Sequence, residues 1–191
     1  SSAASDVYKR QPKEGAKKAV DELNNDLGIR TVMLTGDRKA AAKNIADTLG
    51  IAEFHAELLP QNKVEIVEQE LAKENGKRSV AFVGDGINDA PVIARADVGL
   101  AMGGLGSDAA IEAADIVIMD DRIEKVPLAV RIARRTVRIA WQNIIFALAV
   151  KLATLLLGAL GYAEMWMALV ADVGVCLIAI LNAMRAMHPG K

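Results

Sequence analysis

The sequence has few of the residues on which several protein classes depend. It contains one cysteine, Cys176, among 191 residues, so it can form neither an intrachain disulfide framework nor a zinc site built from several cysteines. Its 23 basic and 24 acidic residues nearly balance and give a net charge of −1. Because a nucleic-acid-binding domain is normally strongly basic, the sequence predicts no nucleic-acid partner.

Charged residues are also scarce toward the end of the chain. Only five of the 47 Lys, Arg, Asp and Glu residues lie after residue 138, although apolar residues make up 52% of the whole sequence. One soluble domain would not show this asymmetry, which predicts a soluble part followed by a membrane part. The five late charges are Lys151, Glu164, Asp172, Arg185 and Lys191.

The chain before residue 139 divides into a short tail and an α/β part. Residues 1–11 show no periodic pattern and are expected to be a disordered or foreign tail. They lack the apolar segment after a basic start that a cleaved signal peptide requires. Across residues 12–138, apolar strand patterns alternate with helical ones, which predicts a parallel sheet covered by helices on both faces. Helices are expected at 16–27, 39–49, 61–74, after Asn88 and from Ser107, and strands at 30–34, 79–83, 98–101 and 116–119.

Two long apolar runs follow the α/β part. They cover about residues 139–161 and 165–185, and each is long enough to cross a bilayer as a helix. The short link predicts a membrane hairpin at 139–187 with a tail at 188–191, and two buried core helices are the alternative. The loop has no Lys or Arg, whereas arginines precede the first run, so both ends and the soluble part are expected in the cytoplasm. The arginines are Arg131, Arg134, Arg135 and Arg138.

Thr35, Gly36 and Asp37 follow the first expected strand. Ligands of open α/β sheets bind beyond the carboxyl ends of the strands, where a hydroxyl, an accessible backbone and a carboxylate suit a phosphoryl group. A turn in which the aspartate caps the next helix is the more common use of this tripeptide. The tripeptide alone therefore leaves both interpretations open.

A stronger pattern, Gly-Asp-Gly-Ile-Asn-Asp-Ala-Pro, follows the strand expected at 79–83. Asp85 and Asp89 lie between a strand end and a helix start, with Asn88 beside them. Two carboxylates and an amide suit Mg²⁺, which prefers hard oxygen ligands together with substrate phosphate. Helix capping by Asn88 or Asp89 is the structural alternative, and it is compatible with metal binding. Lys63, in the first turn of the helix at 61–74, either faces solvent or neutralises phosphate charge.

Lys151 and Asp172 are charges inside the two apolar runs. By helical rise each lies about 15 Å from the loop, at matching depth near the middle of a bilayer. A charge at that depth is costly and usually has a partner. The pair is either a structural ion pair, or Asp172 binds a transported divalent ion and Lys151 replaces that ion as counter-ion. Cys176, one turn from Asp172, is more typical of a packing residue than of a ligand.

The motifs MLTGD, LLPQNK, VGDGINDAP and GLAMG, in this order and before a membrane hairpin, resemble the C-terminal part of a P-type ATPase. The resemblance covers roughly Pro12–Met187. The segment GSDAAIEAADI and the hairpin are similar to the subgroup that exports zinc, cadmium or lead. In that family a haloacid-dehalogenase-like phosphorylation domain passes the γ-phosphate of MgATP to an aspartate. The resemblance therefore implies an ATP-driven pump for Zn²⁺, Cd²⁺ or Pb²⁺ in a membrane, with Mg²⁺ and ATP as cofactors.

The resemblance also implies roles for individual residues. Asp85 is the implied Mg²⁺ ligand, and Asn88 and Asp89 complete the phosphate and cofactor site. Lys63 contacts the phosphoryl group. Other residues implied to line the cleft are Thr35, Gly36 and Asp37, and those implied at the membrane metal site are Asp172 as ligand and Lys151 as counter-ion.

Several parts of such a pump do not occur in this sequence. They are the Asp-Lys-Thr-Gly-Thr motif with the phosphorylated aspartate, the nucleotide-binding and actuator domains, and the Cys-Pro-Cys helix. Arg38 stands where the family commonly has Asn, and residues 24–27 look one residue longer than the usual helix end. We therefore expect a fragment, with a partial phosphorylation domain at 12–138, that is inactive without the N-terminal part of the same pump.

The missing motif also has a consequence for the fold. In the related folds the strand that carries the phosphorylated aspartate is central, so its absence is expected to open the sheet and expose strand edges. Two other functions stay open at this point. One is a membrane-anchored phosphatase of the haloacid-dehalogenase type, and the other is an inactive interaction fragment.

Overall fold

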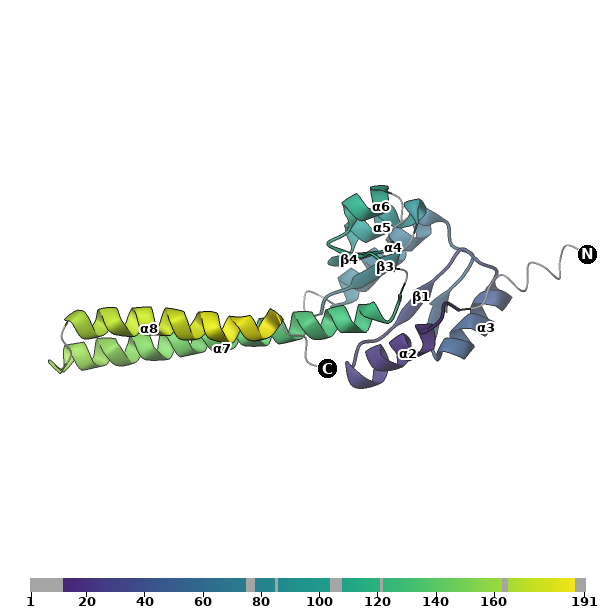
Figure 1. The fold of residues 1–191 in the computed structure, drawn as a ribbon. Coiled ribbons are helices and arrows are strands. Elements are labelled where there is room, and N and C mark those ends of the chain that lie inside the picture. Colours follow the sequence, from purple (N-terminus) through teal and green to yellow (C-terminus); the bar gives the residue numbers. More distant parts are fainter. Residues whose placement is uncertain are drawn as a thin grey trace, which may run out of the picture. The chain divides into compact units, whose positions relative to one another are not determined.

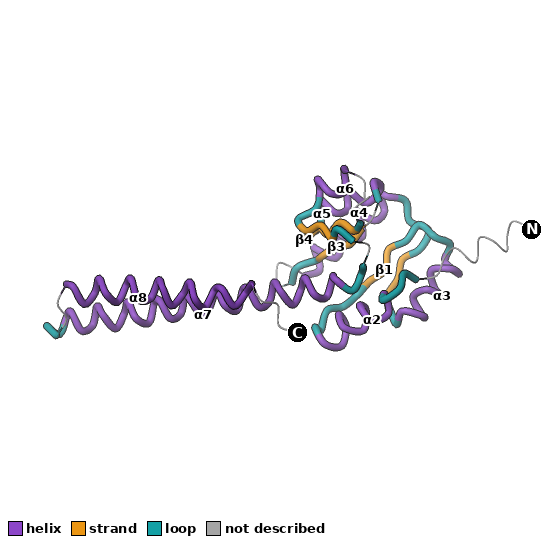
Figure 2. The backbone as a smooth tube through the Cα atoms, viewed as in Figure 1, coloured by secondary structure: helices purple, strands orange, loops and turns teal. Residues whose placement is uncertain are grey.

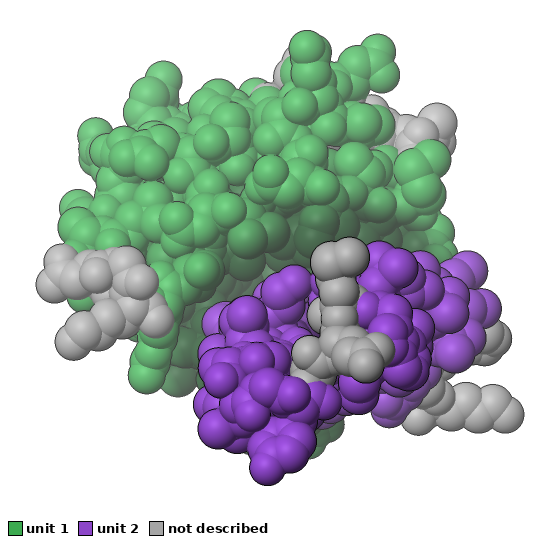
Figure 3. Space-filling view, turned by 90° about the vertical axis from the view of Figure 1, so that its left-hand side faces the viewer, with its two compact units in different colours: residues 1–127 green, residues 128–191 purple. Residues whose placement is uncertain are grey.

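The computed structural model describes residues 12–74, 78–84, 86–103, 108–120, 122–162 and 165–187. The chain divides into two compact units, Ser1–Pro127 and Leu128–Lys191 (Figure 3). The first unit combines strands and helices, and the second consists mainly of long helices (Figures 1 and 2).

The first unit begins with a helix and a two-stranded parallel sheet. Strand β1 pairs with β2 so that Val32 lies opposite Glu53 and Leu34 opposite His55. Helices α2 and α3 lie beside this sheet (Figure 1). The elements are α2 (Ala16–Asp21), the helical turn η1 (Glu22–Asp26), β1 (Val32–Leu34), α3 (Lys39–Leu49) and β2 (Glu53–His55).

The turn η1 is a π-helix, and it lies where the sequence looked one residue too long. The Leu27 amide donates to the Glu22 carbonyl at 3.0 Å, a bond that spans five residues instead of four. A π turn holds one residue more than an α turn, so the extra residue is accommodated inside the helix. The helix then ends, as predicted, at Gly28, whose φ of +63° is the left-handed conformation that glycine adopts at low cost.

The remaining elements of the first unit build a three-stranded parallel sheet, β3-β4-β5. Strand β4 is its centre and is buried along four of its five residues. One cluster of core side chains consists of Leu100, Met102, Ile118 and Val126, and another of Ile93, Ala101 and Ala110. The elements are α4 (Pro60–Glu74), β3 (Ala81–Gly84), the 3-10 turn η2 (Ile87–Asp89), α5 (Ala90–Arg95), β4 (Val98–Met102), α6 (Asp108–Ala113) and β5 (Ile116–Ile118).

The structure confirms the predicted parallel strands with helices between them, but the strands form two sheets (Figure 2). Within the described residues, β1 pairs with β2 only and β3 with β4 only. This division agrees with the expectation that a central strand is missing. The sequence did not predict β2, because Glu53–His55 is only three residues long and contains one apolar side chain.

Ion pairs connect helix α4 to residues that lie next to each of the two sheets. Its Glu70 pairs with Arg30, which precedes β1, and Arg30 also pairs with Glu53 of β2 at 2.8 Å. On the other side, Glu68 pairs with Arg95 of α5 at 2.7 Å. Exposed pairs of this kind stabilise little, but Glu70 is buried, and a buried carboxylate depends on its cationic partners more than an exposed one does. The helix therefore connects the two sheets where strand pairing does not.

Acid should weaken this connection. A hydrogen bond from Lys73 and the charge of Arg30 lower the pKa of Glu70 from its ordinary value of 4.5. A lowered folded-state pKa contributes stability above the unfolded-state pKa, and this contribution is lost as the pH falls through the folded value. We expect Glu70→Gln to lower the urea-unfolding midpoint of the full chain in detergent at pH 7, and to flatten the loss of stability below about pH 4.5.

Glu68→Gln is the matched control, because Glu68 is a half-exposed carboxylate of the same helix that also pairs with an arginine. It should leave the unfolding midpoint at pH 7 nearly unchanged. Equal acid sensitivity of the wild type and Glu70→Gln would show that Glu70 does not link α4 to β1.

The second unit consists of α7 (Lys125–Ala159), which begins three residues before the unit does, α8 (Met165–Met184) and the turn η3 (Arg185–Met187). Two helical segments, Lys125–Ala159 and Leu169–Met187, are long and apolar enough to cross a membrane. The two predicted apolar helices are confirmed, and α7 begins well before residue 139. Hydropathy identifies only the apolar part of a helix, and the residues before it include Ala and Arg, which are good helix formers.

Candidate functional site

Lys63 and Asp89 form the closest contact between predicted site residues. The Lys63 ammonium donates to Asp89 Oδ1 at 2.7 Å, and the two side chains are only 16% and 14% exposed. Lys63 lies in the first turn of α4, where the Asn62 side chain accepts a hydrogen bond from the Leu59 amide. Asp89 ends η2, and its amide donates to the Gly86 carbonyl at 3.0 Å. The structure thus joins two residues that the motifs placed in one site.

The Asp89 side chain does not cap the helix that follows it. Asp89 occupies the N-cap position of α5, but no side-chain cap hydrogen bond forms there. The capping alternative therefore does not describe Asp89, whose carboxylate contacts Lys63 instead. Asn88 is exposed in η2. Asp85, which the sequence placed at the same site, lies outside the described residues.

Gly84 provides the space in which Asp89 folds back onto the end of β3. A Cβ added at Gly84 would lie 2.8 Å from the Asp89 Cβ, closer than real Cβ atoms approach their neighbours, and 3.1 Å from the Phe82 ring, which is a tight contact. At Gly86 the nearest atom would be 3.9 Å away, so a side chain would fit there. Of these two glycines in the motif, Gly84 is therefore the one at which a side chain would clash with its neighbours.

The Thr35–Asp37 segment follows β1, and hydrogen bonds connect it to the residues that precede α4. The Thr35 hydroxyl accepts a hydrogen bond from the Asp37 amide at 3.1 Å, and the Thr35 carbonyl accepts one from the Leu58 amide at 3.1 Å. A Cβ at Gly36 would lie 3.2 Å from the Leu58 carbonyl. Because Leu58 lies two residues before α4 begins, these bonds connect the tripeptide to the helix that carries Lys63. The next helix, α3, has Arg38 as its N-cap, without a side-chain cap hydrogen bond.

The donors at this site fit a magnesium ion that is bound together with phosphate. Asp89 supplies a hard carboxylate oxygen in partly buried surroundings, and Lys63 supplies the cation that a phosphoryl group needs. Among the described residues, no group of three or more His, Cys, Asp or Glu side chains could hold a metal by itself. Mg²⁺ commonly takes one or two carboxylates and completes its shell with phosphate and water.

Lys151 and Asp172 meet between α7 and α8. The Lys151 ammonium lies 3.2 Å from Asp172 Oδ2 and 3.4 Å from Oδ1, so it contacts both carboxylate oxygens. The sequence placed the two residues at matching depth, and the structure brings them into contact. Cys176 carries a free, exposed thiol in α8. A carboxylate and a single counter-ion can form a structural pair or a site for a divalent cation.

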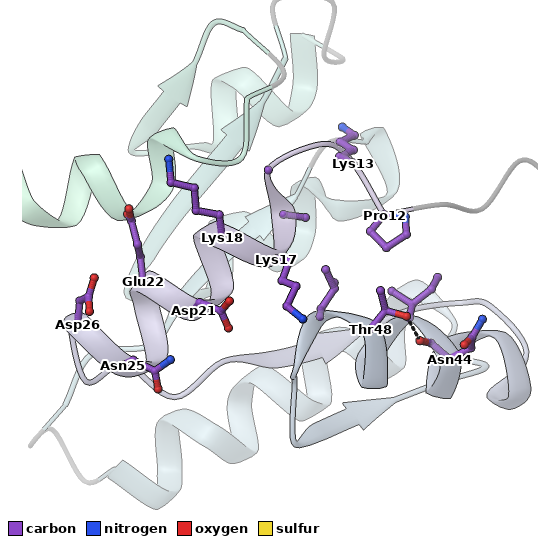
Figure 4. Close-up of a pocket in the computed structure, with 14 residues that line it drawn as sticks. Pro12, Lys13, Lys17, Lys18, Asp21, Glu22, Asn25, Asp26, Asn44 and Thr48 are labelled. Atoms are coloured by element: carbon purple, nitrogen blue, oxygen red, sulfur yellow. Dashed lines mark hydrogen bonds between the residues drawn. The ribbon is translucent and has the colours of Figure 1, made fainter.

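A hollow of about 1130 Å³ lies elsewhere, between α2, η1 and α3 (Figure 4). None of the predicted site residues lines it. Its charged lining mixes both signs, with Lys13, Lys17 and Lys18 beside Asp21, Glu22 and Asp26. The hollow is therefore not the phosphate site that the motifs indicate.

Comparison with known proteins shows what the chain is similar to. Residues 5–97 match the model of the haloacid dehalogenase-like hydrolase family. A cadmium, zinc and cobalt-transporting ATPase of Bacillus subtilis is 58% identical over 92% of this chain, and a zinc-transporting ATPase of Synechocystis is 55% identical over 91%. These alignments cover 25% and 24% of the two relatives, so the chain spans about a quarter of their length.

A solved structure agrees with the sequence comparison. The crystal structure of a zinc-transporting PIB-type ATPase in its E2.Pi state superposes with a TM-score of 0.85 at 39% identity. The match covers 93% of this chain and 28% of that one. It therefore includes residues of both the α/β unit and the two long helices. Over more than nine tenths of its length, the chain is therefore similar to one part of heavy-metal-transporting P-type ATPases.

Proposed function

We propose that this chain is part of an ATP-driven pump that exports a divalent heavy metal, Zn²⁺, Cd²⁺ or Pb²⁺, through an aspartyl-phosphate cycle. The names of its relatives support a metal cargo. The observation that carries the proposal is the contact of Lys151 with Asp172 inside two apolar helices. A membrane-anchored phosphatase is the alternative, but a simple anchor gains nothing from two charges at that depth, where each is costly.

The phosphate site lies in the α/β unit. In the proposed cycle Asp85 and Asp89 hold Mg²⁺, which neutralises phosphate charge when it is bound together with ATP. Lys63 turns its ammonium from Asp89 toward the phosphoryl group and stabilises the charge that develops during transfer. The backbone of Gly36 and the side chain of Thr35 lie at the end of β1, where they form part of the wall of the same cleft. Asn88 and Asp37 complete the polar surroundings.

The division of the sheet supports a partner strand from the N-terminal part of the same pump. Strands β1 and β3 each leave one edge without a partner strand among the described residues. A parallel strand between them would end at the same side of the sheet as Thr35 and Gly84, close to Lys63 and Asp89. Such a strand would carry the phosphorylated aspartate, so we expect this chain alone not to hydrolyse ATP.

The two long helices are proposed to cross the membrane. Their large apolar side chains are mostly exposed, as expected for surfaces that face lipid, and examples are Leu152, Leu155 and Leu169. With arginines before the first apolar run, the positive-inside rule places the α/β unit and the C-terminus in the cytoplasm. The charged pair then lies near the middle of the bilayer, where Asp172 serves as a ligand for the transported ion.

A chimera tests the proposal. The matching quarter of the Bacillus subtilis relative is replaced by this chain, and ATP hydrolysis is measured in nanodiscs with and without Zn²⁺. We expect metal-stimulated hydrolysis within about tenfold of the unmodified relative, because the two segments are 58% identical. The unmodified relative is the positive control. A chimera that inserts and binds ATP normally but shows no metal stimulation would contradict the proposal.

A further inference from the structure

Near the end of the second unit opposite the loop, α7 and α8 are joined by a chain of side-chain hydrogen bonds. The Arg185 guanidinium donates to Asn182 Oδ1 at 2.9 Å, and the Asn182 amide donates to Asn143 Oδ1 at 2.8 Å. The Asn143 amide in turn donates to the Ala179 carbonyl at 3.1 Å. We call Asn143, Asn182, Arg185 and the Ala179 carbonyl the asparagine clasp.

In the clasp, the amide oxygen and the amide nitrogen of each asparagine side chain both form hydrogen bonds. Asn143 uses its oxygen and its nitrogen toward α8, and Asn182 uses its nitrogen toward α7 and its oxygen toward Arg185. Next to the clasp, Arg135 of α7 donates to the Arg185 carbonyl at 2.8 Å. In apolar surroundings an unpaired amide is costly, so such bonds favour the state in which the helices touch.

The hairpin thus has two ends that are fixed differently. At one end the turn at Gly161, with φ of +79°, joins the helices covalently. At the other end the clasp joins them non-covalently. Lys151 lies eight residues after Asn143, about 12 Å along α7, and about 15 Å before the turn. The Lys151–Asp172 contact is therefore about midway between the two fixed ends.

We propose that the asparagine clasp closes the open end of the hairpin and thereby holds Lys151 against Asp172. Asn143 and Asn182 are positioning residues in this proposal, and neither contacts the charged pair. Without the clasp, the helices keep the turn, the Lys151–Asp172 pair and the bond from Arg135 to the Arg185 carbonyl. Apolar packing adds little to these, because lipid chains are as apolar as the helix surfaces. The proposal concerns the geometry of the hairpin and stands whether or not Asp172 binds a metal.

Spin-label distances on the full chain in nanodiscs test the proposal. In a Cys176→Ala background, one pair of labels is placed at the open end, at Val137 and Met184. A second pair is placed near the charged residues, at Leu152 and Val170. All four positions are at least half exposed, so labels disturb packing little. Double electron–electron resonance gives the distance distribution of each pair, and circular dichroism checks that helix content is kept.

The clasp is removed with Asn143→Leu and Asn182→Leu together, which leaves neither amide unpaired. We expect the open-end distribution to broaden and its mean to lengthen by on the order of 5 Å, since packed helix axes lie only about 8–10 Å apart. The distribution near the charged residues should broaden as well. Thr154→Val is the matched control, because the Thr154 hydroxyl bonds to the Lys151 carbonyl within α7 and does not cross to α8. It should change neither distribution.

A second variant separates the clasp from the charged pair. In Lys151→Leu with Asp172→Leu the clasp remains, so the open-end distribution should stay narrow. The proposal is overturned if the clasp variant keeps a narrow open-end distribution. It is also overturned if that variant opens the end but leaves the distribution near Leu152 and Val170 unchanged, because the clasp would then not position the charged pair.

Discussion

Replacing Asp172 with alanine should abolish zinc-stimulated ATP hydrolysis in the complete pump. Asp172 offers the carboxylate that a divalent ion needs, whereas the protonated Lys151 beside it cannot bind a metal and repels it. Loss of groups that only support a metal ligand commonly costs 10–100-fold in affinity or activity, so loss of the ligand itself should exceed about 100-fold. The variant also leaves Lys151 without its partner between two apolar helices.

Lys151→Ala should behave differently from Asp172→Ala. It removes the cation that we propose to compete with the transported ion for the carboxylate, so zinc binding should survive while zinc release slows. Equilibrium Zn²⁺ binding, Zn²⁺ release rates and steady-state ATPase activity, all measured in nanodiscs, distinguish the two variants. Thr154→Ala removes a polar group from the same apolar run without touching the pair, and should behave as wild type. If Asp172→Ala keeps wild-type zinc stoichiometry and turnover, the pair is structural.

Lys63→Met should lower phosphoenzyme formation in the complete pump by about 10²–10³-fold, the usual cost of removing one group that stabilises charge in the transition state. The variant removes the cation proposed to face the phosphoryl group. It also leaves the Asp89 carboxylate, only 14% exposed, without its 2.7 Å partner. Metal binding at the membrane site should persist, because that site uses other residues. Acid-stable incorporation of labelled phosphate from ATP measures the effect.

Lys73→Met is the comparison for this variant. Lys73 is an exposed cation near the other end of the same helix, paired with Glu70 at 2.6 Å, so its loss tests the general effect of removing a lysine from α4. It should leave phosphoenzyme formation within about twofold of wild type, because Lys73 is exposed and Glu70 keeps Arg30 as a partner. Wild-type phosphorylation of Lys63→Met at limiting Mg²⁺ would remove Lys63 from the phosphate site.

Local patterns in the sequence predicted the helices better than the pairing of the strands. The bounds of α3 agree with the prediction at both ends, because Gly50 terminates a clear helical period. The Lys63–Asp89 contact was implied by family motifs, since spacing alone does not reveal which residues of a helix reach a distant turn. Strand β2 was missed because three residues with one apolar side chain give no periodic signal. The role of Asp85 stays a prediction.

The asparagine clasp was also missed, although a signal for it exists. Asn143 and Asn182 are polar residues within the two apolar runs. They lie at similar distances from the loop, 19 and 20 residues from Tyr162, which is the same depth matching that identified Lys151 and Asp172. Depth matching of neutral polar residues in adjacent apolar helices therefore predicts interhelical hydrogen bonds as well as ion pairs.

The division into two sheets also bears on how quickly the α/β unit folds. Each strand pairs with a near neighbour in sequence: Val32 with Glu53, Ala81 with Val98, and Leu100 with Ile116. Contacts between residues roughly 20 positions apart close at low entropic cost, and chains rich in such contacts fold fast. Each sheet can therefore nucleate by itself. A strand inserted between β1 and β3 from a distant part of a longer chain would add the contacts of highest sequence separation, and its docking would be the slow step of folding.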